Sequence, residues 1–254
     1  MKNLLLFLGF VLPVLGFAQL PLVQSKMYQW KEGTSKSDKI SSVVLFEGSA
    51  NDMEYLQMSS NLIGHGKTFS LQIPENEEHL LIVKTGILSI AFKDSVWSIG
   101  GGSVALLMPA EKYSLQNNTS GPCTFYRMKY RSKLPMDLAR GKASGGSFVK
   151  DWNKIPFKPH DRGGIRNYFE RETAMSKRFE MHVTTLKEGI KSHEPHTHRA
   201  EEIVLIIDNQ TEMQMDDKFY KGGPGDIYYL GSNVSHAIRN DGKGTCTYFA
   251  FQFE

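Results

Sequence analysis

The sequence predicts an all-β protein made of two similar barrels in tandem. Short segments of alternating apolar residues are separated by turns rich in Gly, Asn and Asp, which is typical of antiparallel barrels. The clearest such segments are residues 80–83, 87–92, 203–207 and 213–215. The chain also repeats itself, because Asp94 lies 123 positions before Asp217 and Gly102 lies 123 positions before Gly225. No long helical periodicity is present, and one short helix is expected near residues 135–140.

The repeat continues toward the C-terminus of each copy. One extra residue near Met108 is expected to change the offset to 122, so that Asn118 corresponds to Asn240. The two cysteines, Cys123 and Cys246, occupy equivalent places in the two copies. Because equivalent positions of separate barrels are far apart, we expect two buried thiols rather than a disulfide.

Four residues in the second copy have the spacing of a metal site. His196 and His198 are two apart, so on a strand their side chains point to the same side, and Glu202 has the same parity. His236 follows from a second block that begins at Gly225. Three imidazoles and a carboxylate suit one divalent metal, with Mn or Fe as the first expectation and Zn, Ni or Co as alternatives. Histidines in such turns are often only solvated surface residues. Here that alternative would require the spacing of all four residues to match a metal site by accident, so we favour the metal site.

The two blocks resemble the paired motifs of the cupin superfamily. These motifs read glycine–five–His-x-His–three or four–Glu–six–Gly and then Gly–five–Pro-x-Gly-x-x-His-x-x-x-Asn. This sequence departs at turn positions: one extra residue separates Gly189 from His196, Asn209 replaces the closing glycine, and Gly231 and Asn233 replace Pro and Gly. The resemblance implies jelly-roll (double-stranded β-helix) barrels, a two-domain "bicupin" layout and a metal in the second barrel.

The first copy does not keep these ligands. By the offsets above, His196 corresponds to Ile73, His198 to Glu75, Glu202 to His79 and His236 to Ser114. Two possible donors are too few to hold a divalent ion tightly. We therefore expect one metal per chain and a first barrel that serves as a scaffold.

The first residues resemble a secretory signal peptide. A basic start precedes an apolar run over residues 4–17, and Gly16 and Ala18 place small residues at the −3 and −1 positions of a cleavage site. The run is too short for a stable membrane span. We expect cleavage near Ala18 and a secreted or periplasmic protein without a membrane span.

The expected organisation is a signal peptide (1–18), a first barrel (40–132), a connection (133–166) and a second barrel (167–254). The connection is rich in Lys, Arg, Gly and Pro but carries several aromatic residues, so we expect it to wrap the second barrel and cover its mouth. The net charge is +3 and the basic residues are scattered, which argues against nucleic-acid binding. A small-molecule ligand and a monomer or homodimer are expected.

Candidate catalytic groups come from residues near the expected metal. Glu180 and His182 share one face of a predicted strand and could act as a general base, while Tyr228 or Arg239 could orient an anionic substrate. His193 and Glu194 flank the ligands. Each has a structural alternative, as a hydrogen-bonded wall residue, a loop residue or a surface charge.

The layout is similar to that of ureidoglycine aminohydrolase, which implies a metal-dependent aminohydrolase. The ligand pattern of that family, Glu-x-His-x-x-x-His with a distant Gln, differs from the His196, His198, Glu202 and His236 set. Other possibilities are an isomerase, epimerase or lyase that acts on small carboxylates or sugar acids, an Fe-dependent dioxygenase, and a non-enzymatic ligand-binding protein.

Overall fold

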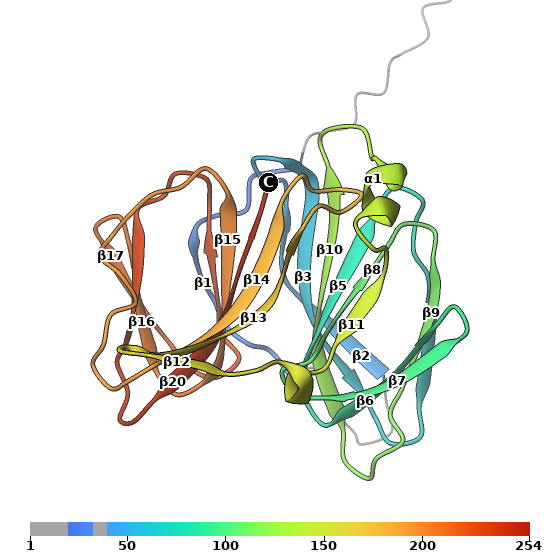
Figure 1. The fold of residues 1–254 in the computed structure, drawn as a ribbon, viewed down its shortest axis with the longest axis horizontal. Helices are drawn as coiled ribbons and strands as arrows, with labels where there is room; N and C mark the ends of the chain where they lie inside the picture. The colour runs from blue at the N-terminus through green and yellow to red at the C-terminus, as the bar shows by residue number, and fades with distance from the viewer. Residues whose placement is uncertain (1–19, 33–39) are drawn as a thin grey trace, which may run out of the picture.

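The computed structural model describes residues 20–32 and 40–254 and consists of two β-barrels packed side by side (Figure 1). The predicted signal peptide lies outside the described residues. The all-β, two-barrel prediction is confirmed. The one α-helix in the described part of the chain, α1 (Leu138–Ala143), begins slightly later than expected, after Asp137, whose side chain accepts a hydrogen bond from the Arg140 N–H at 2.8 Å.

The first barrel consists of two antiparallel sheets. Its strands are β2 (Ile40–Gly48), β3 (Met53–Ile63), β4 (Thr68–Gln72), β5 (Glu78–Thr85), β6 (Ile87–Phe92), β7 (Ser95–Gly100), β8 (Val104–Leu107), β9 (Lys112–Gln116), β10 (Cys123–Ser132) and β11 (Phe148–Lys150). The larger sheet has the order β11-β8-β5-β10-β3-β2, and the smaller has the order β4-β9-β6-β7. Apolar residues that alternate along these strands fill the space between the sheets.

The second barrel repeats this plan. Its strands are β1 (Lys26–Tyr28), β12 (Lys158–His160), β13 (Gly163–Arg171), β14 (Phe179–Leu186), β15 (Glu201–Asp208), β16 (Thr211–Met215), β17 (Lys218–Gly222), β18 (Ile227–Leu230), β19 (His236–Asn240) and β20 (Cys246–Phe253). The larger sheet has the order β1-β18-β15-β20-β14-β13-β12, and the smaller has the order β17-β16-β19. The strand that would correspond to β4 is replaced by an irregular segment, which carries His196 and His198.

Each barrel receives one strand from the segment that precedes the other barrel in the chain. β1 pairs with β18 of the second barrel, whereas β11, which lies in the connection, pairs with β8 of the first barrel. The expectation that the connection wraps the second barrel is therefore wrong for this part, because hydrogen bonding to the edge strand β8 holds it on the first barrel. Trp152, in a 3₁₀ turn (Trp152–Lys154), packs so closely on Gly102 (φ 81°) that a Cβ there would lie 2.3 Å from its ring. Only β12 joins the second barrel before β13 begins at Gly163, four residues earlier than expected.

A third apolar core lies between the barrels, where their larger sheets face each other (Figure 1). Two buried carboxyl groups connect the barrels across it in the same way. The Glu78 Oε1 atom accepts a hydrogen bond from the Ala174 N–H at 2.9 Å, and the Glu201 Oε1 atom accepts one from the Asn51 N–H at 2.7 Å. Glu78 and Glu201 occupy equivalent positions of the repeat, as do Asn51 and Ala174, so this contact follows a pseudo-two-fold axis.

The cysteines agree with the sequence prediction. Cys123 and Cys246 are both buried and free. Burial raises the pKa of the Cys123 thiol to about 12 and that of Cys246 to about 11, so both are held in the unreactive thiol form.

Candidate metal centre

Three histidines of the second barrel converge on one point. His196 and His198 lie between β14 and β15, and His236 begins β19. The expectation that His196 and His198 lie on a regular strand is wrong, since only an isolated bridge connects His196 to His236. In this bridge each backbone N–H donates to the other residue's carbonyl oxygen, at 3.2 and 3.0 Å. The bridge therefore brings the imidazoles of His196 and His236 together although no continuous pair of hydrogen-bonded strands connects these residues.

The ring nitrogens and one carboxylate form a compact set of donors. One ligand nitrogen from each of His196, His198 and His236 lies within 4.8 Å of the others. The Glu202 Oε2 atom, on β15, lies 3.0 Å from His198 Nε2 and 3.4 Å from His236 Nε2. These separations are of the size expected for ligands that share one ion.

Backbone contacts orient two of the imidazoles toward this point. His198 Nδ1 lies 2.8 Å from the Ala200 carbonyl oxygen, and His236 Nδ1 lies 2.8 Å from the Val234 carbonyl oxygen. Each Nδ1 must therefore carry the proton, which leaves the Nε2 lone pairs free to bind a metal. The His236 Nε2 atom is buried and has no well-aligned hydrogen-bond partner in the described parts of the chain. Such an orphaned nitrogen fits a site that is built for an ion.

The electrostatics of the set also suit a cation. Burial alone would raise the pKa of Glu202, but the hydrogen bond with His198 and the charges of His198 and His236 hold that pKa well below its usual value. Burial and the neighbouring imidazoles lower the pKa of His196, while the hydrogen bond to Glu202 raises that of His198. Near neutral pH the set therefore contains an ionised carboxylate, and a proton on His198 is the main competitor of a metal.

His196 and His236 line a cavity of about 290 Å³ inside the second barrel, together with Glu202. Its other polar lining includes His182 from β14, Gln252 from β20, and His160 and Arg162 from the end of the connection. Part of the connection thus borders the mouth of the second barrel, as expected. Apart from Glu202 and Tyr248, the charged and titratable side chains of this lining are cationic or imidazole groups.

Glu180 and His182 form a connected pair beside the metal set. His182 Nδ1 lies 3.0 Å from Glu180 Oε1, and Glu180 also pairs with Arg178. His182 lines the cavity, whereas Glu180 lies behind it. The hydrogen bond from His182 lowers the pKa of Glu180 despite burial that would raise it, so this carboxylate is ionised and can stabilise a proton on His182.

Tyr228 and Arg239 do not reach the cavity. The Tyr228 hydroxyl is buried and bonds to Thr211 and to the Tyr220 carbonyl oxygen, each at 3.1 Å. Arg239 pairs with Glu212 at 2.8 Å and points away from the histidines. We therefore withdraw both as substrate-orienting groups. Strand parity cannot tell which end of a barrel a side chain occupies.

Gln252 is the functional candidate that the sequence analysis missed. Its Nε2 atom donates to Glu202 Oε2 at 3.1 Å and lies 3.4 Å from His198 Nε2, and its Oε1 atom accepts from Arg178 at 3.2 Å. It therefore connects Glu202 with Arg178 and, through it, with Glu180. The available signal was that Gln252 interrupts the large apolar residues near the end of β20.

The first barrel holds different residues at the equivalent place. The hydrogen bonds of Asn117 to Ile63 and Gly121 match those of Asn240 to Leu186 and Gly244. The offset is thus 123 here too, and the expected change to 122 is wrong. In addition, Tyr113 pairs with Phe92 as His236 pairs with Met215.

Tyr113, rather than Ser114, is therefore the counterpart of His236. The Tyr113 hydroxyl lies 3.1 Å from His79 Nδ1, and His79 Nε2 lies 2.7 Å from Glu77 Oε1. A protein hydrogen-bond network thus occupies this position in the first barrel. The expected absence of a metal there stays a prediction.

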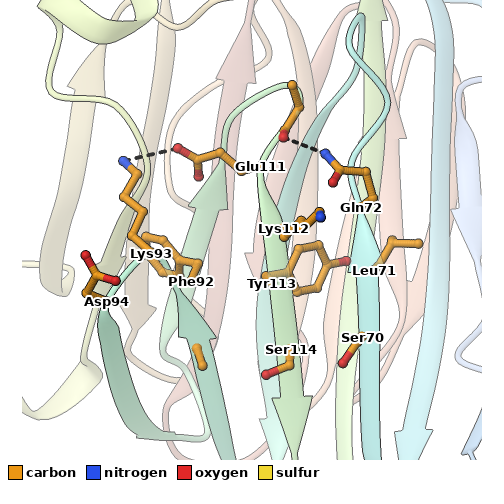
Figure 2. Close-up of a pocket in the computed structure, with 12 residues that line it drawn as sticks. Ser70, Leu71, Gln72, Phe92, Lys93, Asp94, Glu111, Lys112, Tyr113 and Ser114 are labelled. Carbon is orange, nitrogen blue, oxygen red and sulfur yellow. Dashed lines mark hydrogen bonds and ion pairs between the residues drawn. The ribbon is translucent and has the colours of Figure 1, made fainter.

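A larger hollow of about 820 Å³ lies on the outer face of the first barrel's smaller sheet (Figure 2). Its floor contains the small side chains of Ser70 and Ser114, and Lys93 pairs with Glu111 at its rim at 3.1 Å (Figure 2). Ala91, which pairs with Ser114, also lines it. Among the residues that the structure describes, its lining contains no converging set of metal ligands. We therefore place the candidate site in the smaller cavity.

Comparisons with known proteins agree with the fold. Residues 182–251 match the family model of the cupin domain. The structure is similar to AerE from Microcystis aeruginosa (TM-score 0.62, 17% identity, 78% of this chain and 88% of that chain). It is also similar to a putative glyoxylate-induced protein from Pseudomonas aeruginosa (TM-score 0.68, 15% identity, 85% of this chain and 80% of that chain).

A third similar structure is oxalate decarboxylase from Lactobacillus farciminis in complex with formate (TM-score 0.60, 11% identity, 78% of this chain and 76% of that chain). No curated protein matches the sequence. Among the described residues, no helix has the length and apolar character needed to span a bilayer. The second barrel therefore contains a cupin domain, and the chain as a whole has the fold of these solved structures.

Proposed function

We propose that the protein is a metal-dependent enzyme that acts on a small carboxylate or a sugar-acid-like compound in its second barrel. The observation that carries this proposal is the convergence of His196, His198, His236 and Glu202, three of which line a cavity whose remaining charged side chain, Arg162, is cationic. A divalent metal held by these four residues would act as a Lewis acid. Arg162 and the imidazoles of the lining would attract the anionic group of the substrate.

His182 is the general base of this proposal. Its Nδ1 atom bonds to Glu180, so its Nε2 atom is free to take a proton from a substrate in the cavity. The ionised Glu180 then stabilises the imidazolium that forms, and Arg178 holds Glu180 in place. Gln252 acts as a positioning residue, because its amide donates to the Glu202 carboxylate.

The similar structures favour a carboxylate over other substrate classes. One of them is an oxalate decarboxylase in complex with formate, and another is described as glyoxylate-induced. A cavity of about 290 Å³ has room for a small organic acid, since liquid water occupies ~30 Å³ per molecule.

Metal analysis followed by a ligand screen tests this function. We expect one tightly held divalent metal per chain and a rise in melting temperature with one class of small carboxylate or sugar acid. The variant His182→Gln should keep the metal but lose turnover of that compound. The matched control His65→Gln, which changes an exposed histidine of the first barrel, should keep both.

Two outcomes would contradict the proposal. Metal-bound protein that is stabilised by a carboxylate but never converts it would be a binding protein rather than an enzyme. Oxygen uptake that requires Fe would indicate a dioxygenase instead of Lewis-acid chemistry.

We also propose that the protein is exported, on the basis of the basic start and apolar run of residues 1–18. The mature chain would then begin at Gln19. N-terminal sequencing of protein from the periplasm or medium tests this. Intact Met1 on the mature protein would contradict export by cleavage.

A further inference from the structure

The first barrel contains a second internal cavity of about 150 Å³. Its polar lining is contributed by β2, β3 and β10, and its apolar lining includes one aromatic residue from β4. The lining residues are Ser41, Ser42, Asn61 and Arg127, together with Ile40, Leu62, Ile63, Phe69 and Phe125. One half of this cavity is therefore polar and cationic, and the other half is apolar.

This cavity is the counterpart of the metal cavity in the other barrel. Five of its lining residues lie 123 positions before residues that line the metal cavity. The pairs are Asn61 with Thr184, Ile63 with Leu186, Phe69 with Ser192, Phe125 with Tyr248 and Arg127 with Ala250. The repeated fold thus encloses a space at the same place twice. The first one is smaller, and bulky Arg127 and Phe69 stand there in place of Ala250 and Ser192.

Arg127 introduces a positive charge where the second barrel has a methyl group. It pairs with Leu81 across β10 and β5, so its side chain faces the barrel interior with Leu81, which is part of the first barrel's core. Lys129 and His79 face the same side one row further along. Among residues 20–32 and 40–254, no carboxylate lies within ion-pair distance of Arg127.

One donor at this cavity has no partner. The Arg127 Nε atom is buried and makes no hydrogen bond within the described parts of the chain. A buried donor without a partner is destabilising, and such groups are rare in folded proteins. An acceptor that occupies the cavity would satisfy it.

We propose that the first barrel binds a small aliphatic carboxylate without a metal. The carboxylate accepts a hydrogen bond from Arg127, and the short apolar tail packs against Ile63, Phe69 and Phe125. The cavity has room for about five water molecules at ~30 Å³ each, which suits propionate or butyrate. A phosphate ion fits less well, because half of the lining is apolar.

Calorimetric titration with propionate and butyrate tests this site. The titration uses the full chain with the double substitution His196→Ala and His198→Ala, which removes the metal site of the second barrel. We expect one carboxylate per chain and at least a tenfold loss of affinity on Arg127→Gln. The matched control Arg131→Gln, on the same strand but paired with Glu54 at 2.9 Å, should retain binding.

A second variant keeps the test valid if Arg127→Gln does not fold. Ser42 is exposed on the edge strand β2 and lines the cavity, so Ser42→Phe should fill the space and abolish binding while the barrel stays folded. Binding that neither variant weakens, or no binding at all, would overturn the proposal. Equal affinity for inorganic phosphate would also overturn it, because the apolar half would then have no role.

Discussion

Replacing Glu78 by alanine should markedly destabilise the whole protein, because this buried carboxyl group connects the two barrels. Its Oε2 atom accepts a hydrogen bond from the Tyr130 hydroxyl at 2.8 Å, and its Oε1 atom accepts one from the Ala174 N–H at 2.9 Å. Glu78, Tyr130 and Ala174 are all fully buried, each 0% exposed. Water cannot replace the lost partner without opening the core.

The size of the effect follows from these two donors. Each buried donor left without a partner costs about 1–3 kcal/mol, so Glu78→Ala should lower the free energy of unfolding by about 2–6 kcal/mol. Removing the cost of burying a carboxyl group offsets part of this loss. The free energy of unfolding of a domain is only about 5–15 kcal/mol. Even the lower half of the loss expected for Glu78→Ala is therefore a large fraction of the total stability.

Urea denaturation followed by far-UV circular dichroism measures the change. Glu78→Gln keeps an acceptor for Ala174 and a polar group for Tyr130, so it should cost less than about 1.5 kcal/mol. Glu75→Ala, at an exposed position three residues away, should stay within about 0.5 kcal/mol of the original protein. A loss below about 0.5 kcal/mol for Glu78→Ala would refute the structural role of this contact.

The raised pKa of Glu78 also predicts how the stability of the protein changes with pH. Burial raises the pKa of Glu78 in the folded protein above its unfolded value. The folded state therefore binds the proton more tightly, and its contribution to stability is present at low pH and is lost as pH rises. The original protein should become less stable relative to Glu78→Gln between about pH 4 and pH 7. An unchanged difference over this range would contradict the raised pKa.

Four further predictions concern the metal site and the two-barrel packing. The double substitution His196→Ala and His198→Ala should remove the metal and lower the melting temperature, whereas His79→Ala should not change metal content by elemental analysis. Metal retention should fall as pH falls, and at a higher pH than for an ordinary imidazole, because the hydrogen bond that His198 donates to Glu202 raises the pKa of His198. Tyr228→Phe should cost about 1 kcal/mol of stability but leave metal content unchanged. An isolated fragment 157–254 should aggregate or dimerise in light scattering, because the inter-barrel core would be exposed.

Each of these has an opposing result. Two metals per chain that resist dialysis would show that the first barrel also holds one. Metal that stays bound in acid would argue against His198 as a ligand, and metal loss in Tyr228→Phe would place that residue in the site after all. A soluble, monomeric fragment that binds metal would show that the second barrel needs no scaffold.

The sequence by itself determined the fold class and the histidine cluster. Strand alternation and an internal repeat depend on local spacing, so the two barrels could be predicted without any contact information. His196, His198 and Glu202 lie within seven residues of each other, and His236 belongs to a second local motif. A short spacing restricts how far apart side chains can lie, which explains why these histidines were found to converge.

Only the tertiary structure decided which other residues surround that cluster. Gln252 and Arg162 reach the cavity from strands and loops far away along the chain, and Tyr228 points into the same barrel but away from the cavity. Strand alternation gives the face of a sheet but not the position along the barrel axis. The exchange of β1 and β11 between the barrels likewise depends on which edge strand each segment meets. Such choices are made by hydrogen bonds and packing between distant segments, and no local pattern encodes them.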